Sequence, residues 1–146
     1  MKGFTLMEMI LVIAVLAIIF GFSTPFLTNF INRQNLDSVA EELISVLRIA
    51  QNKAIMAEKD SFWGVDFSEE KKYILFSDPR PRGLSAPTKQ EYLLSKNISL
   101  TINNYLLEFE KLTGQLNQSA EIILTIGKQR YRIFVNQEGT IDYYKD

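Results

Sequence analysis

Apolar residues fill the beginning of the chain almost without interruption. The run from Phe4 to Phe22 carries a single charged residue, Glu8. A helix over this run would reach about 28 Å, close to the thickness of the hydrocarbon core of a bilayer. The pattern predicts a transmembrane helix. A kink or short break is expected at Pro25, because proline has no amide hydrogen to donate.

A second helical pattern follows, in which apolar residues recur three or four positions apart. Its members are Leu36, Val39, Ala40, Leu43, Leu47, Ala50, Ala54 and Ala57. This spacing gives a helix with one apolar face. The sequence therefore predicts that the first helix continues into an amphipathic helix, which buries this face against the rest of the protein.

Beyond Asp60 the period changes to two, which is typical of strands with one buried face. Strands are expected over 62–67, 73–76, 92–94, 98–102, 121–126, 131–135 and 140–144, with a short strand at Phe109. The three prolines and the glycine between Asp78 and Pro87 predict a loop. The fold class is thus α+β: a long N-terminal transmembrane helix continues into an amphipathic helix packed on an antiparallel β-sheet.

Composition excludes several kinds of chemistry. The chain has no cysteine and no histidine, so it contains no disulfide, no histidine triad and no zinc site with imidazole or thiolate ligands. Its 16 basic and 17 acidic side chains nearly balance, so no overall field favours nucleic acid. No spaced catalytic constellation is present, and we expect neither enzymatic activity nor a cofactor or metal.

Glu8 is the candidate for function at the N-terminus. A carboxylate in a transmembrane helix is costly and usually has a partner or a purpose. One alternative is a cleaved secretory signal, with Lys2 as its basic residue and a weak cleavage site near Gly21 to Ser23. A plain signal anchor is another, but it leaves Glu8 unexplained.

The residues Gly3-Phe4-Thr5-Leu6, together with Glu8, resemble the prepilin processing motif of type IV pilins and pseudopilins. The resemblance implies cleavage by a prepilin peptidase between Gly3 and Phe4, followed by N-methylation of Phe4. It also implies that Glu8 pairs with the Phe4 amine of a neighbouring subunit during assembly. Pairing with the amine of its own chain is an alternative, which the four-residue spacing allows.

The order of elements over the remaining chain resembles the GspH/FimT branch of that superfamily. The resemblance implies a leader peptide at 1–3, a transmembrane and filament-core helix at 4–31, and an extracytoplasmic pilin-like domain at 32–146. It further implies a single-pass protein of the cytoplasmic membrane with its N-terminus in the cytoplasm, then a filament in the periplasm or at the cell surface. The implied partners are prepilin peptidase, other pilin or pseudopilin subunits, an inner-membrane assembly platform and membrane lipid.

Function therefore falls into a few classes. The favoured one is a subunit of a membrane-extruded filament of a type IV pilus, a DNA-uptake machine or a type II secretion system. An alternative is a filament-displayed DNA-binding minor pilin, since strand alternation would place Lys128, Arg130 and Arg132 on one face. Such rows are more often solvated strand faces. A plain membrane-anchored or secreted binding domain is less favoured.

Overall fold

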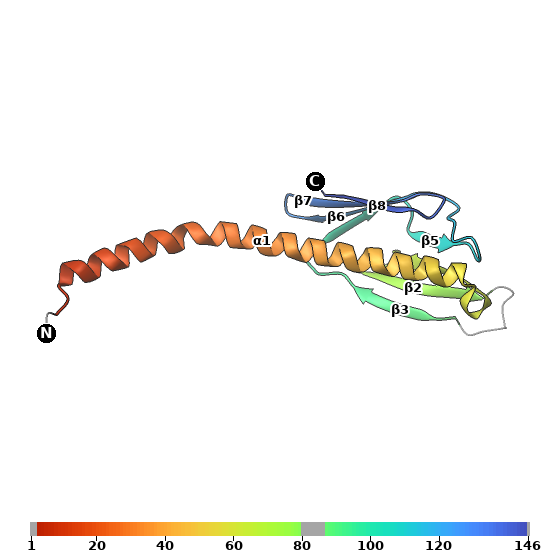
Figure 1. The fold of residues 1–146 in the computed structure, drawn as a ribbon, viewed down its shortest axis with the longest axis horizontal. Helices are drawn as coiled ribbons and strands as arrows, with labels where there is room; N and C mark the ends of the chain where they lie inside the picture. Colours follow the sequence, from red (N-terminus) through yellow and green to blue (C-terminus); the bar gives the residue numbers. More distant parts are fainter. Residues whose placement is uncertain (1–2, 80–86, 146) are drawn as a thin grey trace. The chain divides into compact units, whose positions relative to one another are not determined.

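The computed structural model describes residues 3–79 and 87–145, except for the side chains of residues 22–26. The chain divides into two compact units, Met1–Gln34 and Asn35–Asp146. The described part of the first unit is helical from Leu6 onward, and the second unit combines helix with two β-sheets (Figure 1).

Helix α1 covers Leu6–Ile55 and contributes to both units. Thr5 caps its N-terminus, because the backbone N–H of Glu8 donates to Thr5 Oγ1 at 3.3 Å. The helix continues through Pro25, so the expected break is absent. Proline removes one backbone hydrogen bond from a helix, and here the neighbouring turns maintain the helical backbone.

The expected transmembrane helix over 4–31 is wrong. Within the described residues, no helix is both long and apolar enough to cross a membrane. Phe4 and Thr5 precede the helix, and the polar Ser23 follows Phe22. The helical apolar run thus rises only about 25 Å, short of the roughly 30 Å that a span requires. The expectation of a single-pass protein in the cytoplasmic membrane is wrong for the same reason.

Within its described residues, the second unit holds eight antiparallel strands, which are β1 (Ser61–Asp66), β2 (Lys72–Pro79), β3 (Lys89–Leu93), β4 (Ser99–Ile102), β5 (Leu106–Phe109), β6 (Ala120–Ile126), β7 (Gln129–Val135) and β8 (Ile141–Lys145). They form two four-stranded sheets, in the orders β3-β2-β1-β5 and β4-β6-β7-β8. We expected one sheet. A short 3₁₀ helix, η1 (Glu58–Asp60), precedes β1, and residues 80–86 of the expected loop lie outside the described residues.

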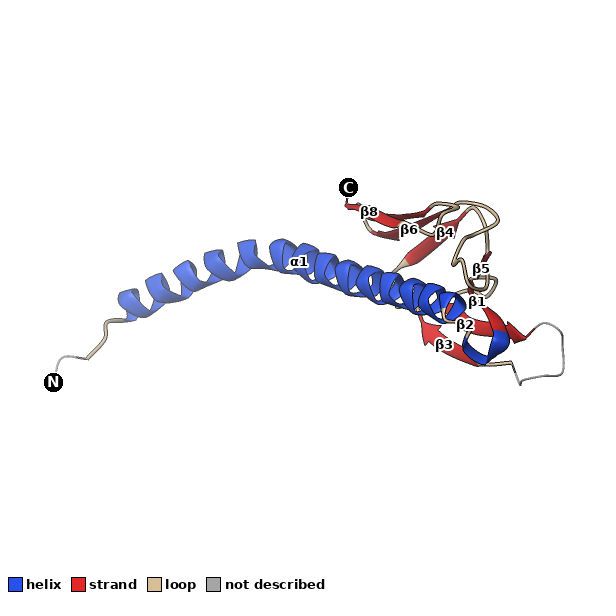
Figure 2. Cartoon of the chain, turned by 45° about the vertical axis from the view of Figure 1, so that its right-hand side comes forward, coloured by secondary structure: helices blue, strands red, loops and turns tan. Residues whose placement is uncertain are grey.

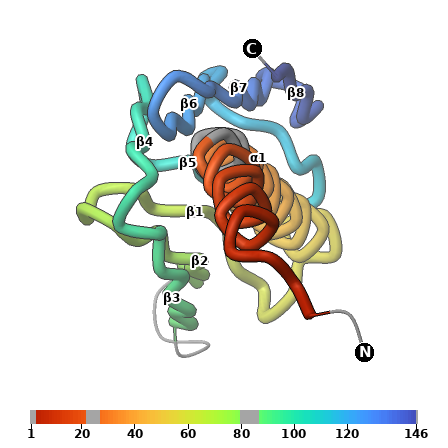
Figure 3. The backbone as a smooth tube through the Cα atoms, turned by 90° about the vertical axis from the view of Figure 1, so that its left-hand side faces the viewer, coloured from red at the N-terminus to blue at the C-terminus, as the bar shows by residue number. Residues whose placement is uncertain are grey.

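The two sheets approach the C-terminal half of α1 from different sides. Figure 3 shows β6, β7 and β8 on one side of the helix and β1, β2 and β3 on another, with the strands in red in Figure 2. The helix packs into this space because its buried positions carry aliphatic side chains, such as Leu43 and Leu47, and small ones, such as Ala40, Ala50 and Ala54. The strands contribute the fully buried Trp63, Phe109, Ile122 and Ile133 to the same core.

Candidate functional site

The cleavage site that the resemblance implies, between Gly3 and Phe4, lies in an accessible segment before α1. Gly3, Phe4 and Thr5 adopt no regular secondary structure, and Phe4 is 80% exposed. A Cβ atom added at Gly3 would meet no atom within 4 Å. The fold itself therefore does not require glycine at this position, and a requirement for it would come from a partner that approaches the backbone closely.

Glu8 lies in the first turn of α1, where a negative charge is favourable beside the positive end of the helix dipole. The pattern Thr5-x-x-Glu8 is that of a capping box, in which a threonine and an acid three residues later satisfy free amides of the first turn. The structure contains the threonine half, the bond from the Glu8 amide to Thr5 Oγ1. Sequence reasoning missed this motif, although its spacing was a readable signal.

The helix that carries Glu8 leaves most of its apolar side chains exposed in the single chain. The large apolar side chains that are exposed between Leu6 and Ile31 are Leu6, Met7, Met9, Ile10, Leu11, Val12, Ile13, Val15, Leu16, Ile18, Ile19, Phe20, Leu27, Phe30 and Ile31. They occur at consecutive positions and therefore point in all directions around the helix. An apolar surface of this extent marks an interaction site rather than a solvated face.

The expected basic row is only partly formed. Arg130 and Arg132 lie on the outer face of β7, which alternates with the buried Tyr131 and Ile133, whereas Lys128 occupies the turn before the strand. Arg130 is exposed and Arg132 is half-buried. Two exposed aromatic side chains share this outer face, Phe134 on β7 and Tyr144 on β8. So do two acids, because Glu121 and Asp142 both stand opposite Phe134.

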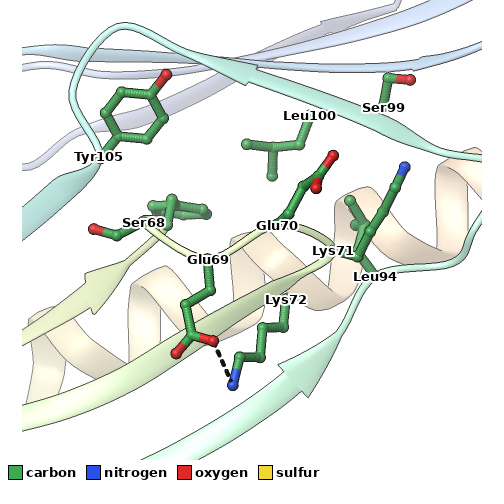
Figure 4. A pocket seen from close by; sticks show the side chains of 10 residues that line it. Ser68, Glu69, Glu70, Lys71, Lys72, Leu94, Ser99, Leu100 and Tyr105 are labelled. Atoms are coloured by element: carbon green, nitrogen blue, oxygen red, sulfur yellow. Dashed lines mark ion pairs between the residues drawn. The ribbon is translucent and has the colours of Figure 1, made fainter.

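A groove of about 310 Å³ opens between the β1–β2 turn and β4 (Figure 4). Its lining residues are Phe67, Ser68, Glu69, Glu70, Lys71, Lys72, Leu94, Ser99, Leu100 and Tyr105. Both lysines are engaged: Lys71 Nζ donates to the Ile98 carbonyl at 2.8 Å, and Lys72 Nζ lies 2.8 Å from Glu69. The hydrogen bond to Glu69 raises the pKa of Lys72. These contacts hold the two lysine side chains against the β1–β2 turn and its neighbours. The groove therefore offers no lysine that is available for catalysis.

The described residues contain no cluster of three or more side chains suited to hold a metal ion. Comparison with known protein families, with curated proteins and with solved structures finds no match to this chain.

Proposed function

We propose that this chain is a subunit of a pilin-like filament and that prepilin peptidase cuts it between Gly3 and Phe4. The observation that carries the proposal is the apolar surface of α1 that is exposed in the single chain, from Leu6 to Phe20 and again at Leu27, Phe30 and Ile31. The lone acid Glu8 lies at its beginning. Other subunits would cover this surface in a filament, which buries apolar area that the chain alone leaves in water.

Glu8 would pair with the Phe4 amine of a neighbouring subunit once that amine is free. Both charges would lie among apolar side chains, where an unpaired charge is far more costly than a hydrogen-bonded pair. The competing explanation is local, because Glu8 also occupies the acidic position of the capping box. A substitution that keeps the cap but removes the charge separates the two roles.

Intact-mass measurement of the protein from its native cell tests the cleavage. We expect a chain that lacks Met1 to Gly3 and carries one additional methyl group at Phe4. Gly3→Ala should block cleavage without changing stability, because the fold leaves space for a methyl group there. A chain whose mature form begins after Ser23 would overturn the proposal.

Sheared filament fractions test the role of Glu8. Glu8→Gln keeps a side chain suited to the capping box, yet we expect it to reduce incorporation about 30-fold or more, as for truncated buried charge pairs. Thr5→Ala is the matched control, because it removes the cap and leaves the charge. Normal incorporation of Glu8→Gln together with a loss in Thr5→Ala would assign Glu8 to the cap alone.

The outer face of β7 favours DNA binding as a second candidate function. Arg130 and Arg132 lie on that face, close to Tyr144, which stands opposite Arg132. Arginine and aromatic side chains together bind single strands through phosphates and stacked bases. Glu121 and Asp142 oppose this on the same face. Weak binding that falls steeply with salt and disappears in a triple alanine variant of Lys128, Arg130 and Arg132 would support it.

A further inference from the structure

Strands β3 and β8 each end one of the two sheets. Among the described strands, β3 pairs only with β2, and β8 pairs only with β7. A strand at the edge of a sheet presents backbone N–H and C=O groups that a further strand can bind. The two edges therefore need to be compared as docking surfaces.

The pairing of β8 with β7 decides which of its backbone groups are free. The Asn136 amide donates to the Thr140 carbonyl at 3.1 Å, so these two residues form a hydrogen-bonded pair. Hydrogen-bonded and non-bonded pairs alternate along an antiparallel ladder. Asp142 and Tyr144 consequently bond to β7, whereas Ile141 and Tyr143 direct their backbone groups to the free edge.

A groove of about 550 Å³ runs between this edge and α1. It is lined by Glu41, Ile44, Ser45, Arg48, Ile49 and Asn52 from the helix and by Tyr131, Tyr143 and Lys145 from the sheet. Within the described part of the chain, neither Glu41 nor Arg48 has an ion-pair partner. The groove thus holds one acid and one base without an ion-pair partner among the described residues, about 10.5 Å apart along the helix. The charge of Glu41 also acts on Lys145 in the same groove, whose pKa is raised by its hydrogen bond to Asp37 and, to a smaller extent, by Glu41.

Two contacts show that β8 runs antiparallel to α1 beside this groove. Lys145 Nζ lies 3.0 Å from Asp37, and Gln51 Nε2 donates to the Gly139 carbonyl at 2.9 Å. Interpolation between these contacts, at about 1.5 Å per helical residue and 3.4 Å per strand residue, places Tyr143 near the level of Glu41. Ile141 then lies close to the level of Arg48.

The same alternation of bonded and non-bonded pairs shows which backbone groups of β3 are free. The Ser77 amide donates to the Thr88 carbonyl at 2.9 Å, and the Leu94 amide donates to the Lys71 carbonyl at 2.8 Å. Gln90 and Tyr92 therefore bond to β2. The free backbone groups belong to Lys89, Glu91 and Leu93, whose side chains are all exposed.

We propose that β3 of one copy of this chain adds to the free edge of β8 in a second copy, antiparallel to it. Lys89 then stands opposite Tyr143, and Glu91 opposite Ile141. In this register the free backbone groups of both strands meet, and the side chains of Lys89, Glu91 and Leu93 enter the groove.

The charges of the two surfaces match in this arrangement. Lys89 reaches Glu41, and Glu91, which keeps part of its side chain exposed beside Lys72, reaches Arg48. Leu93 arrives at the end of the groove that Ile49 and Asn52 line. Lys89 and Glu91 are separated by about 6.8 Å along the strand, whereas Glu41 and Arg48 are about 10.5 Å apart along the helix. The long side chains cover this difference.

The contact joins two different surfaces, so it does not close on itself as a two-fold contact does. Each copy has one β3 edge and one β8 edge, and addition can continue from copy to copy. The inference rests on the proposed function in one respect, that copies of this chain meet in a filament; it adds the contact between their sheet domains.

Cysteine cross-linking of the full chain tests the register, because the native sequence has no cysteine. Opposed residues of a hydrogen-bonded pair lie about 5.5 Å apart at Cα, within the range that a disulfide bridges. Lys89→Cys and Tyr143→Cys chains, mixed and oxidised, should form a mixed dimer, and each variant alone should stay uncross-linked. Lys89→Cys mixed with Tyr144→Cys is the control, since residue 144 points to the opposite face.

Electron microscopy of the same samples separates this inference from the proposed function. Filaments without the mixed dimer would overturn the inference and leave the function standing. A mixed dimer without filaments, in protein whose first residue is Phe4, would support the inference and overturn the function. Cross-linked Lys89→Cys homodimers would also overturn the inference, because they require a two-fold contact between β3 edges.

Charge exchange gives a second measurement. Lys89→Glu and Glu41→Lys should each weaken self-association in sedimentation about two- to fivefold, the effect of one exposed ion pair. The double variant should restore it. Lys96→Glu changes the same charge in the exposed turn before β4 and should have no effect. A loss in Lys96→Glu equal to that in Lys89→Glu would show that net charge, not this contact, controls association.

Discussion

The units Met1–Gln34 and Asn35–Asp146 use the same apolar residue types in opposite ways. Leu43 and Leu47 of the second unit are fully buried, whereas Leu11 and Leu16 of the first are among its exposed apolar residues. The difference arises because two sheets cover the helix in the second unit, while the described part of the first unit contains no strand. Apolar composition therefore predicts burial only where the same chain provides the covering surface.

This contrast also separates the kinds of function that each unit supports. The second unit meets the requirements of a stable core within itself, and its candidate sites are grooves and strand edges. The first unit has its candidate residues, Gly3, Phe4 and Glu8, on accessible chain beside an uncovered apolar surface. Its role depends on what covers that surface.

The strongest test of the contrast is a matched pair of leucine substitutions. Leu47→Ala should lower the free energy of unfolding by about 2–5 kcal/mol, because it leaves a cavity in a packed core. Leu11→Ala, at a side chain that is 62% exposed, should change it by less than about 0.5 kcal/mol. Denaturant unfolding followed by fluorescence of Trp63, the single tryptophan, measures both. A similar loss in both variants would contradict the division into covered and uncovered apolar surfaces.

Glycines give a second matched pair. A Cβ atom at Gly64 would lie 2.3 Å from the Leu107 carbonyl oxygen and 2.7 Å from the Phe76 ring, so β1 and β5 would have to separate. Gly64→Ala should therefore cost about 1–3 kcal/mol, the range of overpacked cores. Gly3→Ala should cost nothing by the same unfolding measurement. Gly64→Ala with native stability would show that the sheet adjusts more easily than its packing indicates.

The hydrophobic pattern located most strands because it reports which side of a strand is buried. In β7, for example, Tyr131, Ile133 and Val135 are all buried and alternate with more exposed residues, as expected. It did not reveal two sheets, since the pairing of β1 with the distant β5 depends on contacts far apart in sequence. Local periodicity carries no information on strand order.

The candidate sites divide in the same way. Short motifs were readable, including the Gly3 to Glu8 pattern and the capping spacing of Thr5 and Glu8, which was overlooked. The groove between α1 and β8 was not readable, because it exists only where Arg48 and Tyr143 come together in the fold. The transmembrane expectation is wrong because α1 begins at Leu6, so the helical part of the apolar run is shorter than the run that begins at Phe4.

The smallest expected effect concerns a polar group inside the covered unit. Tyr73 is 1% exposed, and its hydroxyl has no hydrogen-bond partner within the described part of the chain. Burial, with a smaller contribution from the charge of Glu42, raises the pKa of Tyr73 above its usual value. Tyr73→Phe removes an unsatisfied hydroxyl and should leave stability unchanged or raise it by up to about 1 kcal/mol at pH 7.

The raised pKa of Tyr73 also makes the stability of the protein depend on pH. A tyrosine in the unfolded chain loses its proton near pH 10, while Tyr73 in the folded chain keeps it to higher pH. Ionisation of Tyr73 therefore does not affect stability below pH 10, and stability falls as pH rises above that value, because only the unfolded chain loses the proton there. Tyr73→Phe should flatten the alkaline decline, and Tyr105→Phe, at an exposed tyrosine, should not. An unchanged slope in Tyr73→Phe would mean that this hydroxyl is solvated in the folded protein, and that the core is less closed at β2 than its packing indicates.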